Sequence, residues 1–354
     1  MRVGLVLGAG GVLGGAWLTG ALEALARQTG WDPGTADYMV GTSAGSVIGS
    51  LVAAGVPPWF MVAHSAGEVF TGVVDAEGRP AAEADRSGGA VFRLERALPP
   101  IGPGSPGLAF RSLMKPHRHT PIALVAGWLP RGVISTAPLK EIVQRVVPSG
   151  WSYHPRLWIV ACDYATGRRV AFGREGAPEA ELADAVAASC AIPGFYHPVR
   201  IGDRRYVDGG VYSNSNLDLL RNEELDLVIC LNPTSTLHPL KAWKPADRLA
   251  ATARRASGRR LGSEAKKLCA RGVPVVLIQP TGKDVEMMGA NLMSRRRRHD
   301  VIRLAIETVG DQLREPEVAE RLRGLPPGAP ERVHRPPGSP SSWPGLYENL
   351  SEAS

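Results

Sequence analysis

The sequence predicts an α/β protein with a layered core built on a mostly parallel sheet. Short apolar runs of strand length alternate with longer helical patterns along most of the chain, and this alternation is typical of that class. The 354 residues, of which 44% are hydrophobic, are enough for one large core. A charged fraction of 21% fits a globular chain rather than a disordered one.

The N-terminal segments follow a strand–helix–strand–helix order. The apolar run Val3–Leu7 is followed by glycines and is predicted as a buried strand. A helical pattern extends from about Gly14 to Gln28. A short strand at Tyr38–Val40 then leads into a helix of small residues at Ser46–Ala54, which glycine and proline residues end.

The later segments extend the same alternation. The predicted strands are Leu157–Cys162, Arg169–Phe172, Leu227–Leu231 and Val273–Ile278. The predicted helices are Pro138–Val147, Glu179–Cys190, Asp247–Cys269 and Asn291–Leu313. We therefore expect one domain over residues 1–325, with residues 221–325 completing its sheet and helices.

Two regions depart from this pattern. The stretch from Thr71 to Arg131 is irregular, and its segment Pro99–Gly107 is too rich in breakers for a core element. We predict it as an insertion or lid. From Leu325 the chain is rich in Pro, Gly and Ser, and residues 326–354 are predicted as a disordered or loosely attached tail.

The net charge of +7 favours anionic partners. Most of the surplus comes from Lys241–Arg271, which contains ten basic and two acidic residues. A solvated helical face explains this stretch, and attraction to an anionic membrane surface is the second interpretation. The basic run Arg295–Arg298 has no nucleic-acid-binding motif beside it, so no nucleic-acid partner is expected.

The four cysteines, Cys162, Cys190, Cys230 and Cys269, form no CxxC pair. Buried thiols are therefore expected rather than a metal site or a disulfide framework. The apolar run at the N-terminus is too short for a signal peptide, and no stretch is apolar enough for a transmembrane helix. A cytoplasmic location, with peripheral contact at a membrane, is the simplest expectation.

The segment Gly41-Thr42-Ser43-Ala44-Gly45 fits the pattern G-x-S-x-G, between a predicted strand and a predicted helix. Such a turn holds its central serine in a strained conformation and projects the hydroxyl from the sheet, while the glycines allow close backbone approach. The helix N-terminus favours negative charge there. Ser43 is therefore a candidate nucleophile, although an ordinary strand–helix turn has the same pattern.

The run Gly8–Gly15 follows the first strand and opens a helix. A dinucleotide-binding turn, an oxyanion hole and a purely structural turn all fit a loop of this kind. The strict G-x-G-x-x-G pattern fails because Leu13 occupies the last glycine position. Asp32 and Asp37 are the acidic residues at the distance of a ribose ligand, but the next strand leads into the serine turn instead.

The base for a nucleophilic serine is usually histidine, but the eight histidines are poor candidates. Four of them lie in basic, proline-containing or tail segments, namely His117, His119, His299 and His334. Structural roles are expected for the other four, which are His64, His154, His197 and His238. The turn Asp208-Gly209-Gly210 offers a carboxylate at a strand end, which can take a serine proton directly. An ordinary hairpin turn has the same sequence.

The glycine loop, the serine turn and Asp208-Gly209-Gly210, in this order, resemble the patatin-like phospholipase family. The segment Ala188–Val199, which precedes the Asp-Gly-Gly turn, and Asn216, which follows it, are also similar to that family. The resemblance covers about residues 3–220. It implies a three-layer α/β/α fold and hydrolysis of lipid acyl esters, without a metal or cofactor.

Carried onto this chain, the resemblance implies that Ser43 is the nucleophile and Asp208 its base. The backbone amides around Gly10, Gly11 and Val12 would form the oxyanion hole, and the motif glycines are Gly41, Gly45, Gly209 and Gly210. The expected partner is a lipid or acyl ester substrate. No oligomeric state follows from the sequence.

Three positions depart from the family's pattern. Leu13 stands where the family usually has Arg or Lys, Ala9 where it has Gly, and Leu217 where it has Pro. The missing cation bears on phospholipid preference more than on ester cleavage. A non-catalytic lipid-binding protein on the same fold and a dinucleotide-binding oxidoreductase are the alternative functions. Trp59, Phe60 and Met61 are candidates for the entrance of an acyl channel or for core packing.

Overall fold

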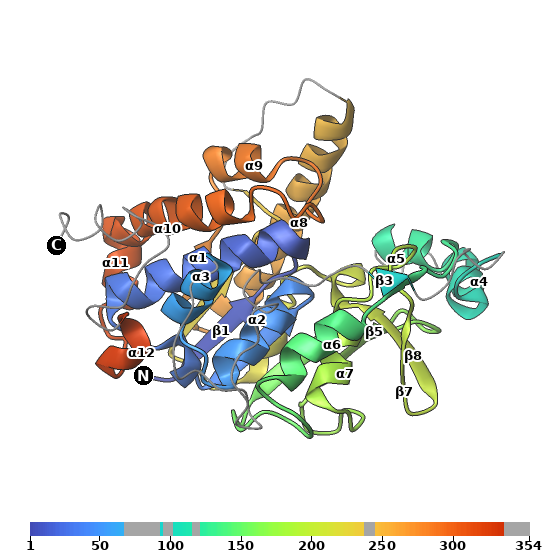
Figure 1. Ribbon diagram of the computed structural model, residues 1–354, viewed down its shortest axis with the longest axis horizontal. Helices are drawn as coiled ribbons and strands as arrows, with labels where there is room; N and C mark the ends of the chain where they lie inside the picture. Colours follow the sequence, from blue (N-terminus) through green and yellow to red (C-terminus); the bar gives the residue numbers. More distant parts are fainter. Residues whose placement is uncertain (67–92, 95–101, 115–120, 237–244, 336–354) are drawn as a thin grey trace.

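A mostly parallel sheet forms the centre of the computed structural model, which describes residues 1–66, 93–94, 102–114, 121–236 and 245–335 (Figure 1). Five parallel strands follow the order β10-β9-β1-β2-β5, and an antiparallel hairpin of β8 and β7 pairs through β8 with the carboxyl end of β5. The parallel strands are β1 (Val3–Leu7), β2 (Tyr38–Thr42), β5 (Leu157–Asp163), β9 (Leu227–Leu231) and β10 (Val275–Ile278). The antiparallel strands are β6 (Arg169–Phe172), which pairs with β5, β7 (Val199–Ile201) and β8 (Arg204–Asp208).

Helices cover both faces of this sheet, so the predicted three-layer α/β/α fold is confirmed. Along β1, Leu5 and Leu7 belong to the core under one helical layer, whereas Val6 belongs to the core on the opposite face. The first layer contains α1 (Gly11–Thr29), α2 (Ala44–Ala53), α6 (Ala137–Gln144), α7 (Leu182–Ser189) and α10 (Arg298–Arg314). The second contains α8 (Pro245–Cys269) and the 3-10 segment η5 (Leu217–Asn222).

Shorter elements complete the described chain. They are η1 (Pro33–Thr35), α3 (Pro58–Ser65), β3 (Arg93–Leu94), α4 (Pro106–Met114), α5 (Pro121–Ala126), β4 (Ile134–Ser135), η4 (Gly209–Val211), α9 (Gly282–Met288), α11 (Pro316–Leu322) and α12 (Pro330–Val333). The predicted strands all form, and three of them have the predicted bounds. The last long helix was expected from Asn291 but begins at Arg298, because residues before it form turns.

The described part of the predicted insertion contains two helices, which share a small apolar cluster with the β5 and β8 region. Leu108 of α4 and Ala126 of α5 pack against Tyr164 and Val211, which belong to the β5 and β8 region. Ser105, inside the breaker-rich segment, is buried and donates to the Tyr164 carbonyl oxygen at 2.6 Å. One residue of the breaker-rich segment, which was not expected to be a core element, is therefore buried in the structure. Most of residues 71–101 and residues 115–120 lie outside the described part, and the lid role stays a prediction.

Part of the predicted tail contacts the domain. Val333 is buried, and Arg332 forms an ion pair with Asp32 at 2.9 Å. The indole nitrogen of Trp59 donates to the Glu331 carbonyl oxygen at 3.0 Å. Contacts with the domain therefore continue beyond residue 325, and residues 336–354 lie outside the described part.

Three of the four thiols are buried as expected, but Cys269 is exposed at the end of α8. Within the described residues, no helix combines the length and the apolar character needed to cross a membrane.

Helices α1 and α10 pack most closely at Gly20. A methyl group on Gly20 would overlap the Ile302 carbonyl oxygen and lie 2.9 Å from the Ala305 Cβ. We expect Gly20→Ala to lower the free energy of unfolding by about 1–3 kcal/mol, since overpacking forces the helices apart.

The matched control is Gly262→Ala in α8, where an added Cβ meets no atom within 4 Å. This change should raise stability by about 0.5–1 kcal/mol, because glycine is a poor helix former. Urea unfolding monitored by circular dichroism measures both variants. Equal midpoints for the two variants would contradict close packing at Gly20.

Candidate active site

Ser43 lies in a strained turn between β2 and α2. Its backbone angles are φ 52° and ψ −121°, a conformation that residues other than glycine rarely adopt. A Cβ at Gly45 would overlap the Leu7 carbonyl oxygen, and one at Gly41 would lie 2.6 Å from the Ser46 Cα. The two glycines are therefore required by close backbone contact, as the G-x-S-x-G pattern predicts.

Two further serines hold this turn in place. The Ser43 amide donates to the Ser189 hydroxyl at 2.9 Å, and that hydroxyl donates to the Val160 carbonyl oxygen at 2.6 Å. The Ser46 hydroxyl donates to the Ser43 carbonyl oxygen at 2.6 Å. These bonds satisfy buried polar groups and fix the strained backbone. Ser189 lies within the segment that resembles the family, but its role follows only from the structure.

The edges of β5 explain how β2 and β8 meet. Ile159 and Val160 pair with β2 on one edge and with β6 on the other. Ala161 and Cys162 also pair with β6, so their second partner, β8, occupies the same edge as β2. The two strands therefore meet end to end along one edge of β5.

Ser43 and Asp208 stand at this meeting point. Thr42, the last residue of β2, pairs with Val160, and Asp208, the last residue of β8, pairs with Ala161. If β2 continued, Ser43 would take the place opposite Ala161 that Asp208 holds. Both strands turn away here at their carboxyl ends, which places the serine next to the carboxylate.

The Asp208 side chain is buried, with 5% of the residue exposed. Burial raises the pKa of this carboxyl to about 6, while hydrogen bonds from the Ser43 side chain and the Gly210 amide oppose the shift. The Gly210 amide lies 2.7 Å from Asp208 Oδ1. Burial also raises the pKa of the nearby Cys190 thiol, and the Asp208 charge adds to that shift. The carboxylate thus faces neutral neighbours and a serine hydroxyl.

No described histidine is among the groups that shift the Asp208 pKa. His154 makes its bond at 2.7 Å with the Ala36 carbonyl oxygen, just before the amino end of β2, and His64 stacks on Phe60. The Asp208 pKa is shifted by burial and by hydrogen bonds from Ser43 and the Gly210 amide, and no described cation contributes to the shift.

The glycine loop lies against both of these motifs. Ala9 donates its amide to the Asn214 carbonyl oxygen at 2.7 Å, and a Cβ at Gly210 would lie 3.7 Å from the Ala9 Cβ. On the other side, a Cβ at Gly15 would lie 3.8 Å from that of Ala44. The three motifs that are distant in sequence therefore converge at the carboxyl ends of the central strands.

Backbone amides at the start of α1 are available to a ligand. The amides of Leu13 and Gly14 have backbone acceptors, whereas those of Gly10, Gly11 and Val12 have none within the described residues. The left-handed φ of 60° at Gly11 turns the chain into the helix. Unpaired amides at a helix N-terminus favour negative charge, as an oxyanion hole requires.

Two of the three departures from the family's pattern have structural explanations. Leu13 is buried in the core below α1, so its aliphatic side chain contributes to packing. The Leu217 amide donates to Glu264 at 3.1 Å, a bond that proline could not make. Asn216 donates to the Thr42 hydroxyl at 3.0 Å and so ties the Asp-Gly-Gly segment to the end of β2.

A buried cation supports the glycine loop from behind. Arg254 of α8 donates to the Pro233 carbonyl oxygen at 2.8 Å. The Pro233 ring in turn packs against the loop, because a Cβ at Gly10 would lie 2.7 Å from its Cγ. Sequence reasoning placed Arg254 only within a solvated basic helix, and nothing in its spacing distinguishes it from its exposed neighbours.

The other candidate residues serve packing. Trp59 and Met61 are buried and Phe60 is half-buried, and the Trp59 indole donates to the backbone of the C-terminal segment. These contacts favour core packing over a channel entrance. Asp37 accepts a bond from the Val3 amide at 2.7 Å, and Asp32 pairs with Arg332. Both possible ribose ligands of a dinucleotide site are therefore occupied. The described residues contain no cluster of His, Cys, Asp and Glu that could hold a metal ion.

The fold and the site define a class of three-layer α/β proteins in which a strained serine faces a buried carboxylate. The model of the patatin-like phospholipase family matches residues 5–221, more than half of the 354-residue chain, and the chain therefore belongs to this family. The match agrees with the resemblance seen over residues 3–220. Membership indicates lipid acyl hydrolysis as the general function and lipids as the substrates.

The raised pKa of Asp208 predicts a specific pH dependence of stability. The folded state holds the proton up to about pH 6, whereas an unfolded aspartate loses it near 3.8, so ionisation of Asp208 lowers stability as the pH rises between these values. The difference in free energy of unfolding, wild type minus Asp208→Asn, should fall by about 2–3 kcal/mol from pH 4 to pH 7.

Urea unfolding at several pH values measures this difference. Comparison with the variant is needed because burial also raises the pKa of Glu23, to about 7. The exposed Asp311→Asn on α10 is the control and should show no such trend. A difference that stays constant with pH would rule out an elevated pKa at Asp208.

Proposed function

We propose that the protein is a carboxylic ester hydrolase that cleaves lipid acyl esters through a dyad of Ser43 and Asp208. The end-to-end meeting of β2 and β8 on β5 is the observation that carries this proposal, because it sets a serine beside a buried carboxylate. Family membership supports the lipid substrate. The strained turn and the unpaired amides of the glycine loop are further support.

In the first half of the reaction, Asp208 accepts the Ser43 proton while the serine oxygen attacks the ester carbonyl carbon. Negative charge develops on the carbonyl oxygen, where the amides of Gly10, Gly11 and Val12 stabilise it. The tetrahedral intermediate collapses to an acyl-serine. Asp208 returns the proton to the leaving oxygen, and an alcohol or lysolipid departs.

In the second half, Asp208 takes a proton from water, and the resulting hydroxide attacks the acyl-serine. Collapse of the second intermediate releases the fatty acid, and the proton returns to Ser43. A carboxyl group with a pKa near 6 suits both steps, since it is ionised at neutral pH yet basic enough to accept a serine proton. A single residue thus acts as base and acid in each half.

Replacement of the nucleophile should abolish turnover. We expect Ser43→Ala to lower kcat for p-nitrophenyl acyl esters at least a thousandfold, on the order of other serine hydrolases that lose their nucleophile. Ser263→Ala, an exposed serine on α8, is the control and should keep full activity.

Labelling with a fluorophosphonate separates this proposal from that of a non-catalytic lipid-binding protein. Wild type and Ser263→Ala should be labelled, and Ser43→Ala should not. Binding of fatty acid without labelling of the wild type would favour the binding protein.

The pH dependence of catalysis should follow one ionisation. We expect kcat/KM to rise about tenfold per pH unit below pH 6 and to level off above it, because the base must be deprotonated. Rates for a soluble ester between pH 4.5 and 8 test this. A rate that does not change below pH 6 would exclude Asp208 as the base.

A further inference from the structure

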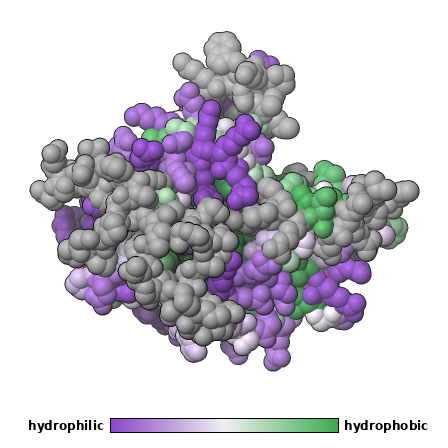
Figure 2. All heavy atoms as spheres, viewed as in Figure 1, coloured by the Kyte–Doolittle hydropathy of each residue, from purple (hydrophilic) through white to green (hydrophobic). Residues whose placement is uncertain are grey.

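Large apolar side chains are exposed together on and beside α4 and α5. Of the ten exposed large apolar residues in the described chain, eight lie here, with exposures from 38 to 73%. They are Leu94, Phe110, Leu113, Met114, Ile122, Val125, Trp128 and Leu129, and we call them the α4–α5 apolar face. In Figure 2, hydrophobic atoms gather over this lobe. Such concentration marks an interaction surface, because exposed apolar residues are otherwise scattered.

The charged side chains described in the two helical segments that carry this face are cations. Residues 102–114 and 121–131 include Arg111 and Arg131 and no Asp or Glu. Arg111, in the last turn of α4, is exposed among the apolar residues. A surface that combines aromatic and aliphatic side chains with cations matches the interface of an anionic bilayer, where tryptophan is also favoured.

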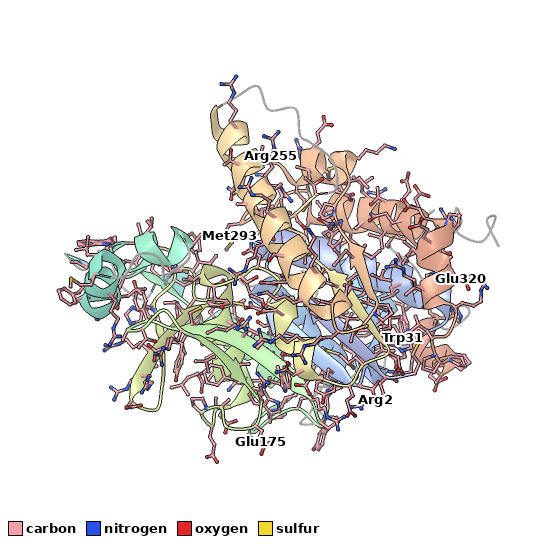
Figure 3. The ribbon with its side chains drawn as sticks, turned by 180° about the vertical axis from the view of Figure 1, so that it is seen from behind. Arg2, Trp31, Glu175, Arg255, Met293 and Glu320 are labelled. Carbon is pink, nitrogen blue, oxygen red and sulfur yellow. The ribbon has the colours of Figure 1, made fainter. Side chains whose placement is uncertain are left out.

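The lobe that presents this face is fixed to the candidate active site. Leu108 and Ala126 pack against Val207 and Val211, which flank the Asp-Gly-Gly turn on both sides. The Tyr164 hydroxyl donates to the Ala126 carbonyl oxygen at 3.1 Å and ties α5 to the end of β5. Figure 3 shows the lobe on the side of the molecule opposite Glu320 of α11. Contact at this face would therefore bring the carboxyl ends of β5 and β8 close to the surface it touches.

We propose that the α4–α5 apolar face docks on the surface of anionic phospholipid bilayers and so presents the active site to lipid. The inference rests on the proposed function, because an enzyme of this kind must reach acyl chains held in an aggregate. The basic stretch of α8 was the membrane candidate on sequence grounds. The α4–α5 face combines charge with exposed apolar area, which allows insertion as well as attraction.

Vesicle sedimentation tests the proposal independently of catalysis. The full chain carrying Ser43→Ala, so that no lipid is hydrolysed, is mixed with sucrose-loaded vesicles of phosphatidylcholine with or without phosphatidylglycerol. We expect binding to the anionic vesicles and weaker binding to the neutral ones. In the same background, Phe110→Ser with Leu113→Ser should reduce the partition coefficient at least tenfold, since each substitution removes a large apolar side chain that would enter the bilayer.

The matched control is Tyr153→Ser. Tyr153 is 99% exposed but precedes the amino end of β5, away from the face, and its loss should leave binding unchanged. Urea unfolding verifies that all variants fold. Equal binding by the double variant and the control, or no binding to anionic vesicles by any variant, would overturn the proposal. A dimer in size-exclusion chromatography that the double variant dissociates would also overturn it, because the face would then join two copies.

Hydrolysis by chains that keep Ser43 distinguishes the docking face from the proposed dyad. The ratio of vesicle hydrolysis to soluble-ester hydrolysis should fall about tenfold in the double variant. If the Ser43→Ala chain binds anionic vesicles and the added Phe110→Ser and Leu113→Ser substitutions abolish that binding, the docking face is supported even where wild type shows no esterase activity. Esterase activity with an unchanged ratio supports the dyad alone and overturns the docking face.

Discussion

The pairing of two strands with one edge of β5 is the constraint on which the site depends. β2 runs parallel to β5 and β8 runs antiparallel to it, and the carboxyl ends of both strands meet at one point along that edge. The backbone of β5 supplies partners to both strands, so the separation of Ser43 and Asp208 follows from the regular spacing of a sheet. Elements that hold sheet geometry are more accurate supports for reacting groups than loops are.

The polar groups around this junction are used to maintain it. Ser189 bridges the elbow amide to β5, and Asn216 bridges the Asp-Gly-Gly segment to β2. Asn216 itself has a left-handed φ of 53° and receives a bond from Arg169, which pairs with Asp218 at 2.6 Å. These buried bonds offset the strain at Ser43 and the cost of burying Asp208. The surrounding hydrogen bonds thus stabilise a strained backbone at Ser43 and a buried carboxylate at Asp208.

Local sequence patterns predicted much of this arrangement. Val3–Leu7 and Leu227–Leu231 are continuous apolar runs because parallel strands are buried on both faces, and such runs are easily recognised. The glycine loop, the G-x-S-x-G turn and the Asp-Gly-Gly turn were also recognisable, since each requires glycine for local steric reasons.

Contacts between distant segments could not be predicted in the same way. The short strand Val199–Ile201 has too few residues for a periodic signal and forms through its pairing with β8. The α4 and α5 helices lie among breakers, and their helical state depends on packing against Tyr164 and Val211. The positions of Ser189 and Arg254 follow from tertiary structure alone. A proline-rich composition suggested that residues after 325 are loose, yet Val333 and Arg332 find partners in the domain.

The pairing of β8 with β5 also limits how this site can vary. Side chains alternate between the faces of a sheet, so a shift of one residue in the β5–β8 register would turn Asp208 to the opposite face. The next register that restores its direction lies two residues away, about 7 Å along the strand. Gradual adjustment of the distance between the two groups by sliding is therefore impossible. Substrate preference can change through the loops and helices around the junction, while the junction itself is either kept or lost.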